Sequence, residues 1–460
     1  MKTSSQNKVL YSKYIFILLM INSLFSVEIH VPQDYLLIQD AIDNSNTGDI
    51  IMVSPGVYYE SIMIDGKYIS LISTHGPFST TINGIAISAP LINIQNCSDF
   101  FPLVSGFTLI SDHVGMEQST THIPYLLPAA GSIINIINSK ANFANLVIHE
   151  EIDHASVENN IVFIKDSNVN LNRILYENSK DGFIVAFNSE IEISNSTIRN
   201  IELNDYEYIF SISNTNITVS QSVLKNTHTQ FLGQIVIGKS GSEYVSVEFR
   251  DFIMAENTSS YSIITSYDMV DTKFFDSTII NNICNGFELP HTGAIIIYHG
   301  NLFVENSIII NDFQTDDYNY FDFKFENPID ISFNYSIIDT NNINHFYDNC
   351  SNCAESNEVS FINPELNNSY LLTEYSPGID SGNPNNIDFD GTISDIGAYQ
   401  YLIEGDGNFD NIVNISDILI LINLILNNSI PSHIELFAYS SVDDELLDIL
   451  DIVRLVNLIL

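Results

Sequence analysis

Basic residues are scarce in this sequence. Its 460 residues include 15 Lys and Arg against 57 Asp and Glu, which gives a formal net charge of −42 at pH 7. Nucleic-acid binding depends on clustered Lys and Arg that displace counterions from phosphates, so this composition argues against it. The same charge disfavours binding to an anionic membrane. A chain with this much internal repulsion suits a medium in which salt or calcium screens the charge.

Cysteine is also rare, and tryptophan is absent. An exported chain of this length does not need a disulfide framework. Cys350 and Cys353 have the spacing of half a zinc knuckle or of a redox pair, but no second pair completes a zinc site. We therefore expect a small local disulfide or two unused thiols there. Cys97 and Cys284 are expected to be buried side chains.

Long hydrophobic runs are missing except near the N-terminus. Lys2, Lys8 and Lys13 precede a mostly apolar stretch at 14–25, and small residues lie near Ser26. These features are typical of a secretory signal peptide, and the apolar stretch is short for a transmembrane helix. We predict a signal peptide over 1–26, export, and no membrane insertion after cleavage. A short uncleaved anchor is the alternative.

Short strands punctuated by asparagine are abundant between about 130 and 340. An alternating apolar strand is followed by Asn, Asp or Ser, an apolar pair and another Asn, as in 191–200 and 217–226. The period of 22 to 30 residues, without a helical pattern, fits one coil of a stacked parallel solenoid. Asn at the corners suits left-handed backbone turns. The units begin at Ala141, Val169, Ile191, Ile217, Val245, Thr272, Leu302 and Ile329.

The first part of the mature chain supports this architecture. An apolar i, i+3, i+4 set at Ile38, Ala41 and Ile42 predicts a short amphipathic helix that covers the open end of a solenoid. Turn and strand signals then alternate up to about residue 73. The segment resembles the N-terminal cap and first coils of the pectin-lyase-like, right-handed parallel β-helix proteins. The motifs that carry the resemblance are Val31-Pro-Gln-Asp-Tyr35, Gly48-Asp49, Pro55-Gly56 and Tyr58-Tyr59-Glu60.

A second segment, 376–399, resembles the closing coil of many exported β-helix proteins. Asp388, Asp390 and Asp395 in this segment offer closely spaced oxygen ligands of the kind that calcium takes. We favour ordinary turn hydrogen bonds for them. Together the two resemblances imply an all-β fold, a right-handed parallel β-helix over 27–402.

The last 58 residues have a different character. Residues 414–426 and 448–460 are identical at eight of 13 positions, at an offset of 34, and each copy predicts a helix with an apolar stripe. Before the first helix, Asp406, Asn408, Asp410 and Asp417 stand at positions 1, 3, 5 and 12 of a calcium loop. Ile412 at position 7 would contribute its backbone carbonyl.

The second copy of this loop is degenerate. Its positions 1 and 3 are Ser440 and Val442, so only Asp444, Asp448 and Asp451 are plausible ligands. Because valine has no side-chain ligand atom, we expect this second site to be weak or empty.

A duplicated calcium loop and helix at a chain terminus resembles a type I dockerin. The resemblance implies a small α-helical domain over 403–460, calcium as a cofactor and a cohesin-type protein module as a partner. The alternative is a two-helix acidic tail that binds no metal.

The resemblances together imply an exported protein, secreted or at the cell surface, that acts on or binds polysaccharide. As an enzyme it would be a polysaccharide lyase or a glycoside hydrolase, but no acid, base or nucleophile set matches a known pattern, so no catalytic residues are predicted. The alternative is a non-catalytic surface adhesin or glycan-binding rod. Candidates for stacking on sugars are Tyr261, Tyr267, Tyr298, Tyr318 and Tyr320.

Overall fold

The computed structural model describes most of the chain. The described residues are 26–84, 89–111, 132–150, 160–203, 208–229, 234–238, 244–267, 269–284, 293–311, 321–326, 330–338, 358–360, 362–440 and 447–460. Residues 1–25 of the predicted signal peptide lie outside these ranges, and so do Cys350, Cys353, Tyr318, Tyr320 and Asp444. Within them, no helix has the length and hydrophobicity needed to cross a membrane.

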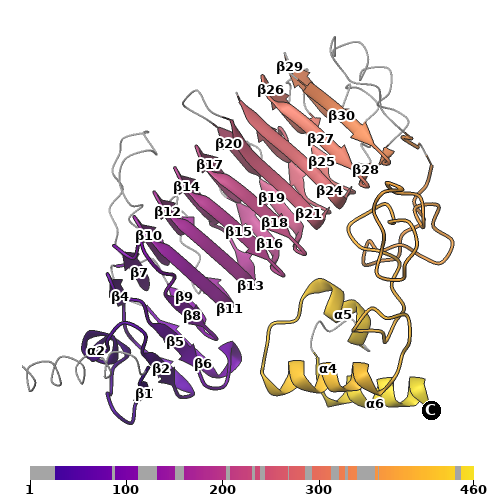
Figure 1. Ribbon diagram of the computed structural model, residues 1–460. Helices are drawn as coiled ribbons and strands as arrows, with labels where there is room; N and C mark the ends of the chain where they lie inside the picture. Colours follow the sequence, from indigo (N-terminus) through magenta and orange to yellow (C-terminus); the bar gives the residue numbers. More distant parts are fainter. Residues whose placement is uncertain are drawn as a thin grey trace, which may run out of the picture.

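Parallel strands stack into a β-solenoid (Figure 1). Among the described residues, ten strands form one sheet, which we call sheet 1. Its strands are β4 (Ile62–Asp65), β7 (Ile92–Gln95), β10 (Ile134–Ile137), β12 (Asn160–Lys165), β14 (Gly182–Phe187), β17 (Phe210–Ser213), β20 (Ile235–Gly238), β23 (Ile264–Ser266), β26 (Gly293–Tyr298) and β29 (Phe321–Glu326).

The other strands form one continuous sheet that bends into two ladders. The first ladder, sheet 2, contains β1 (Glu28–Val31), β2 (Ile50–Val53), β5 (Ser70–Ser73), β8 (Leu103–Ser105), β15 (Glu190–Ser194), β18 (Asn216–Ser220), β27 (Asn301–Glu305) and β30 (Asp330–Asn334). The second, sheet 3, contains β3 (Gly56–Tyr58), β6 (Thr80–Asn83), β9 (Thr108–Ser111), β16 (Thr197–Leu203), β19 (Val223–Thr229), β22 (Thr258–Ser259), β25 (Ile283–Cys284), β28 (Ile308–Ile310) and β31 (Ile337–Ile338). Four long strands belong to both ladders: β11 (Lys140–Glu150), β13 (Asn168–Ser179), β21 (Val245–Ala255) and β24 (Val270–Ile280).

The register confirms most of the predicted repeat. Ile191 pairs with Val169 on one side and with Ile217 on the other, as its place in the repeat predicts. Two predicted unit starts are wrong by two residues, because Ile217 pairs with Val247 and Leu302 pairs with Ile331. A shift of two residues keeps the same face of a strand inward, so the alternating pattern did not distinguish the two registers. The hand of the coil stays a prediction, consistent with the general preference of parallel crossovers.

Apolar side chains on alternate strand positions fill the interior as one continuous column. Left-handed residues turn the chain at the corners, as the asparagine pattern predicts. Two series mark the corners between sheets. The corner from sheet 1 to sheet 2 has Asn96, Asn138, Asp166, Asn188, Asn214, Met269 and His299, and the corner from sheet 2 to sheet 3 has Asn145, Arg173, Asn195, Gln221, Asp251, Asp276, Asn306 and Tyr335.

The N-terminal end is covered as predicted. Helix α2 (Ile38–Asn44) buries Ile38, Ala41 and Ile42 against the first coils. Glu60 accepts hydrogen bonds from the first backbone N–H groups of this helix, from Ile38 at 2.9 Å and from Gln39 at 3.0 Å. A carboxylate in this position satisfies donors that the helix itself leaves unpaired. A short 3₁₀ turn, η1 (Pro77–Ser79), precedes β6.

The described residues of 358–402 form what we call the strap. The predicted closing coil at 376–399 is wrong, because this segment contains turns and one isolated antiparallel bridge, from Ile387 to Ile393, and no strand. The strap starts at the last coil, where Ser360 bridges Ile337, and crosses earlier coils along the corner between sheets 2 and 3. The spacing of Pro and Gly in 376–382 predicts turns both in a closing coil and in a strap. The sequence therefore does not distinguish these two structures.

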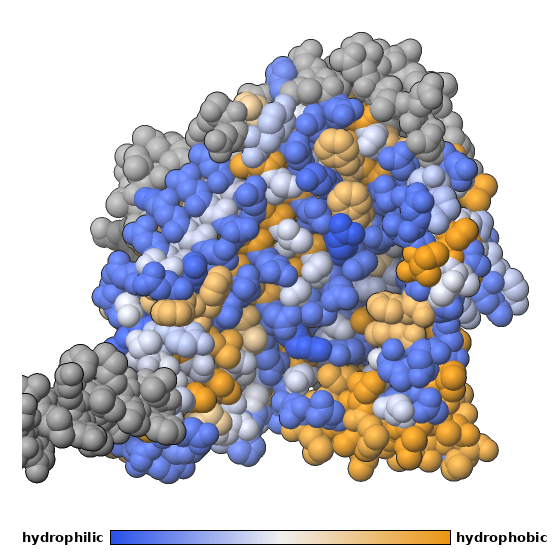
Figure 2. All heavy atoms as spheres, in the orientation of Figure 1, coloured by the Kyte–Doolittle hydropathy of each residue, from blue (hydrophilic) through white to orange (hydrophobic). Residues whose placement is uncertain are grey.

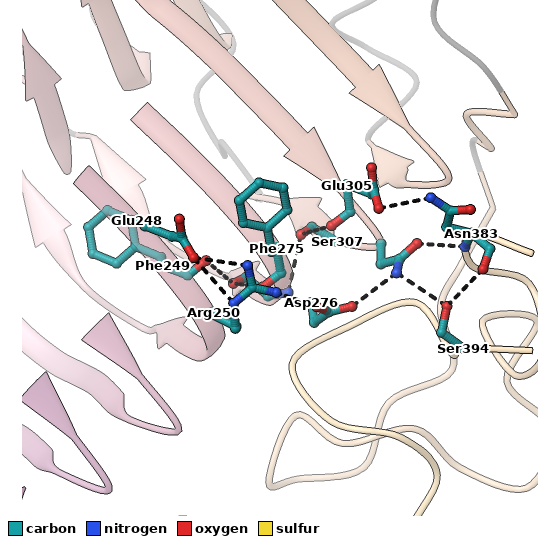
Figure 3. A network of polar contacts seen from close by, with 11 residues as sticks. Glu248, Phe249, Arg250, Phe275, Asp276, Glu305, Ser307, Asn383 and Ser394 are labelled. Atoms are coloured by element: carbon teal, nitrogen blue, oxygen red, sulfur yellow. Dashed lines mark hydrogen bonds and ion pairs between the residues drawn. The ribbon is translucent and has the colours of Figure 1, made fainter. Parts of the chain in front are cut away.

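Polar contacts tie the strap to this corner (Figure 3). The Asn306 side chain accepts a hydrogen bond from the backbone N–H of Asn383 at 2.7 Å and donates to Asp276 at 3.0 Å. It also donates to the Ser394 hydroxyl at 3.2 Å. One coil away, Arg250 reaches Asp276 at 3.5 Å. The strap is therefore attached to the coils by specific side chains.

The C-terminal module comprises the described residues of 403–460. Helices α4 (Ile415–Leu426) and α6 (Ile449–Ile459) confirm the duplicated helices that the sequence predicts. A further short helix, α5 (His433–Tyr439), was not predicted. Leu421, Ala438 and Leu455 bring the three helices into one small core. The module lies beside the solenoid in Figure 1.

Candidate functional site

Asp406 begins the loop that leads into α4. Its side chain is only 2% exposed. One carboxylate oxygen accepts from the backbone N–H of Asp410 at 3.3 Å, and the other accepts from Asn411 at 2.7 Å. Asn411 has a φ of 63°, a left-handed conformation that asparagine tolerates at a position where glycine is usual. Asp406 thus holds the first half of the loop in a tight turn.

Asp417 is fully buried at the opposite end of the loop. Its Oδ1 accepts from the backbone N–H groups of Gly407 at 3.0 Å and Asn408 at 3.3 Å. Its Oδ2 accepts from the backbone N–H of Asn414 at 2.8 Å, which completes a capping box at the start of α4. One carboxylate therefore fastens the start of the loop to the start of the helix, where the helix dipole favours negative charge.

The three other predicted ligands lie between these two aspartates. The Asn408 side chain donates to Asp410 Oδ2 at 3.0 Å, and Asp410 Oδ1 accepts from the backbone N–H of Ile412 at 2.9 Å. All five predicted residues thus belong to one wrapped loop. Their carboxylates are engaged by backbone N–H groups, and no three Asp, Glu, His or Cys side chains in the described ranges converge as a metal cluster.

Tyr439 at the end of α5 packs against the loop. Its ring lies so close to Gly407 that a Cβ there would come within 1.6 Å of the phenol oxygen. The phenol oxygen is buried and has no hydrogen-bond partner among the residues that the structure describes. Burial, and then the negative charges of Asp417, Glu435 and Asp406, raise the pKa of Tyr439. The phenol oxygen of Tyr439 lies beside the buried carboxylates of Asp406 and Asp417, so the loop offers oxygen atoms only. A donor set of this kind is compatible with a hard cation such as calcium.

The second copy repeats the helix start. Asp448 is the N-cap of α6 and Asp451 stands three residues later, so the capping box of Asn414 and Asp417 recurs. The backbone N–H of Asp448 donates to Asp451 at 2.8 Å. Asp448 and Asp451 thus have a structural role as helix caps, and their role as ligands stays a prediction.

The module is fastened to the solenoid through α5 and the segment before it. Arg173, at a left-handed corner position, donates from both terminal nitrogens to the two carboxylate oxygens of Glu435, at 2.7 and 2.8 Å. It also donates to the carbonyl of Ile430 at 2.7 Å. The Asn145 side chain accepts from the backbone N–H of Ile430 at 2.7 Å, and Asn428 donates to the carbonyl of His75 at 2.8 Å. The module is therefore seated against the coils that contain β5, β11 and β13.

One face of α4 and α6 is apolar and exposed. Figure 2 shows it as a broad hydrophobic patch at the lower right, where Figure 1 places these two helices. The exposed residues are Ile415, Leu419 and Leu426 on α4, and Ile449, Leu450, Val453, Leu458 and Leu460 on or beside α6. Contiguous apolar surface of this kind on a soluble domain typically marks an interaction site.

The described tyrosines among the stacking candidates meet at sheet 1. The Tyr267 and Tyr298 rings are stacked, with centroids 5.3 Å apart and planes 8° from parallel. The Tyr261 and Tyr298 hydroxyl groups are 2.5 Å apart. Because Tyr267 is exposed, this cluster presents an aromatic surface to solvent. The prediction that these residues could form a stacking surface is compatible with this arrangement.

The aspartates of the strap form turn hydrogen bonds, as favoured from the sequence. Asp395 accepts from the backbone N–H groups of Asp380 at 2.7 Å and Tyr401 at 2.6 Å. Asp388 accepts from the backbone N–H of Asp395 at 2.8 Å. Cys97 and Cys284 are buried, which confirms the expectation for them.

Sequence reasoning missed several residues that shape the site. Tyr439, Gly407, Arg173 and Glu435 act through contacts between segments far apart in the chain. The only local signal was the Ser432 to Glu435 spacing, a capping-box pattern that predicts the start of α5.

Comparison with known proteins gives likenesses at the level of solved structures only. The sequence matches no protein-family model and no curated protein. An alginate lyase, AlyF-OU02 in complex with G6, is 10% identical over 82% of this chain and 96% of its own, with a TM-score of 0.38. Pectate lyase Pel9A is 12% identical over 79% and 91%, with a TM-score of 0.31. PfbA, a surface adhesin of Streptococcus pneumoniae, is 11% identical over 68% and 85%, with a TM-score of 0.30. At these identities and TM-scores, the activities of these proteins are not carried over to this chain.

Proposed function

We propose that the protein is an exported β-solenoid that binds polysaccharide and is attached to a cohesin-type protein through its C-terminal module. The observation that carries the attachment is the exposed apolar face of α4 and α6, the two duplicated helices. The apolar face is present on both duplicated helices and lies beside a calcium-type loop. This arrangement fits a docking module better than an acidic tail, because an acidic tail does not require duplicated helix caps or duplicated apolar surface.

Calcium in the 406–417 loop belongs to this proposal. Asp406, Asn408, Asp410 and Asp417 would hold it through side-chain oxygens, and Ile412 through its carbonyl. The ion would supply a fixed positive charge that stabilises the loop against the start of α4. In a chain of net charge −42, such a charge also relieves repulsion among nearby carboxylates.

Polysaccharide binding is supported by the resemblance of the first coils and by the stacked pair Tyr267 and Tyr298. Aromatic rings of this kind offer a flat apolar face with a polar edge, which suits a sugar. The alternative is a polysaccharide lyase or glycoside hydrolase on the same solenoid. Incubation of residues 27–460 with neutral and acidic polysaccharides, followed by mass spectrometry, separates the two. Released oligosaccharides would establish an enzyme, and retention without release would establish a binding rod.

The attachment is tested with residues 27–460 on immobilised cohesin modules, with calcium or with a chelator. We expect calcium-dependent capture, which Leu419→Asp abolishes because a charge on an apolar interface is costly. Ile387→Asp is a matched control, since Ile387 and Leu419 are both 62% exposed but Ile387 lies on the strap. Capture that is equal for both variants, or unaffected by chelation, would contradict the proposal.

Calcium binding itself is measured by titration calorimetry. We expect one strong site per chain, lost in the double variant Asp406→Ala/Asp410→Ala, since the second copy lacks ligands at positions 1 and 3. The double variant Asp388→Ala/Asp390→Ala on the strap serves as a control that keeps the site. If titration of the unmodified chain with calcium released or absorbed no heat of binding, the calcium part of the proposal would be overturned.

A further inference from the structure

A polar groove of about 500 Å³ lies between sheet 3 and the strap. Its floor includes Glu177, Arg199 and Lys225, which are aligned in register on β13, β16 and β19. Asn368 and Tyr370 of the strap form the opposite wall. The groove is separate from the calcium-type loop and from the tyrosine cluster at sheet 1.

A second row of side chains runs parallel to this floor. Asn178, Asn200 and Asn226 have φ values of 56°, 55° and 54°, so each is in the left-handed conformation. Their amides form a ladder, with Asn200 donating to Asn178 at 3.4 Å and Asn226 donating to Asn200 at 2.6 Å. Successive members are one strand spacing apart, about 4.8 Å. The groove therefore presents the same polar group repeatedly along the solenoid axis.

Both sides of the groove are held in place. Arg199 donates from Nε to Glu177 at 2.7 Å and contacts the same carboxylate through a terminal nitrogen at 2.6 Å. These side chains are only 16% and 14% exposed. On the opposite wall, Tyr370 is hydrogen-bonded to Glu256, and burial followed by this bond raises the pKa of the phenol. A site whose polar groups are fixed before a ligand arrives loses less entropy on binding.

The charges of the groove are balanced. Two of the 15 basic residues of the chain line it, together with two carboxylates, Glu177 and Glu256. In a protein of net charge −42, a balanced groove neither repels a neutral ligand nor concentrates a polyanion. Amides, a phenol, carboxylates and cations together offer donors and acceptors to a ligand that carries many hydroxyl groups.

We propose that this groove binds a neutral oligosaccharide whose chain runs along the solenoid axis. The inference rests on the proposed polysaccharide-binding role, and it adds the place and the charge class of the ligand. The repeated amides match a polymer that repeats its own hydroxyl groups. The strap completes the site, because Tyr370 and Asn368 come from it.

The test measures binding of cellohexaose, xylohexaose, laminarihexaose, mannohexaose and hexagalacturonate to residues 27–460 by titration calorimetry. The groove variant is Asn200→Gly/Asn226→Gly, which removes two amides and keeps a backbone that tolerates positive φ. The matched control is Asn188→Gly/Asn214→Gly, a pair with the same backbone conformation and the same ladder bond at the corner between sheets 1 and 2.

We expect at least one neutral hexasaccharide to bind, with affinity at least tenfold lower in the groove variant and within twofold of the unmodified chain in the control. Binding that the groove variant leaves unchanged would overturn this site while leaving the polysaccharide role intact. Binding of hexagalacturonate alone would overturn the neutral class. No binding of any probe would overturn the site and the polysaccharide role together, and the cohesin capture above would still test the attachment.

Discussion

Asp251 is a residue whose ionisation is shifted by burial and by neighbouring charges. It lies at a left-handed corner position, with Arg250 beside it, Asp276 one coil further on, and Asp388 and Tyr399 facing it from the strap. Burial, then the charge of Asp276, raises the pKa of Asp251 from 3.8 to about 7, although Arg250 opposes the shift. The folded chain therefore holds this proton more tightly than the unfolded chain does.

This shift predicts how stability depends on pH. Because the folded-state pKa is the higher one, the contribution of Asp251 to the free energy of unfolding is complete below about pH 4 and is lost as pH rises towards 7. We expect the variant Asp251→Asn to lose less stability than the unmodified chain over this window, measured by urea denaturation at half-unit pH steps.

The control for this experiment is Asp166→Asn. Asp166 also occupies a left-handed corner position, but on the corner between sheets 1 and 2, away from the strap. This variant should follow the pH dependence of the unmodified chain. If Asp251→Asn did the same, the pKa of Asp251 would not be raised in the folded chain.

His433 should change the pH dependence of stability in the opposite direction to Asp251. Desolvation lowers the pKa of His433 from 6.5 to about 4, and Lys225 also lowers it, although the hydrogen bond between the imidazole and the Ser369 carbonyl oxygen opposes the shift. A depressed pKa in the folded state means that stability is present above about pH 6.5 and is lost as pH falls towards 4. We expect His433→Gln to flatten this acid loss in thermal unfolding scans. An unchanged slope between pH 6.5 and 4 would show that the imidazole is not held neutral.

At the scale of elements, buried amide ladders join successive coils. Asn257, Asn282 and Asn311 are completely buried, and each donates to the next, with Asn257 to Asn282 at 2.9 Å and Asn282 to Asn311 at 2.9 Å. Asn282 also donates to the carbonyl of Met254 at 2.9 Å. Because backbone and side-chain groups share these bonds, removal of one member leaves several buried polar groups unpaired.

The ladder predicts a large effect for a substitution of similar size. We expect Asn282→Leu to lower the free energy of unfolding by about 3 kcal/mol or more, measured by denaturant titration. The neighbouring Asn281→Gly should change it by less than about 1 kcal/mol, because Asn281 has a φ of 56° and glycine accepts that backbone. Similar losses for both variants would assign the effect to the turn instead of to the ladder.

The pair Arg173 and Glu435 predicts coupling between the solenoid and the module. A double-mutant cycle with Arg173→Ala and Glu435→Ala should give a coupling energy of about 1 to 3 kcal/mol, since the pair is two-pronged and mostly shielded from solvent. Arg173→Lys should recover little of it, because a lysine makes one contact where arginine makes two. A coupling near zero would mean that the other contacts of the module, including those of Ile430 with Asn145 and of Asn428 with His75, seat it without this pair.

The elements show where sequence reasoning succeeds and where it stops. Alternation of apolar residues and asparagine at corners predicts the coils, and the alignment of 414–426 with 448–460 predicts α4 and α6, because these signals are local or repeated. The two unit starts at Val245 and Ile329 were wrong because a two-residue shift preserves the inward face. The strap, α5, Tyr439 and the polar groove depend on contacts across the whole chain, which no local pattern encodes.

At the scale of the whole molecule, charge dominates the response to the medium. A net charge of −42 gives long-range repulsion that salt screens over a distance of about 8 Å at physiological ionic strength. We expect the unfolding temperature to rise by several degrees between 20 and 500 mM NaCl, measured by differential scanning calorimetry. Equal ionic strength from different monovalent salts should give the same rise, and a fall with added salt would show that the buried ion pairs outweigh the repulsion.

The strap also determines how the molecule would carry mechanical load. Solenoids ordinarily yield from an end, one coil at a time, because each coil touches only its neighbours. Here the strap and the C-terminal module together span from the bridge at Ile337 to the early coils, where Asn428 of the module donates to the His75 carbonyl. If the module is anchored to a partner and a polymer is bound in the groove, tension between them would therefore act along the stacking axis of the solenoid. The contacts of the strap and of the module with the solenoid would then be loaded together in shear. This arrangement would resist unfolding of the coils one at a time from an end.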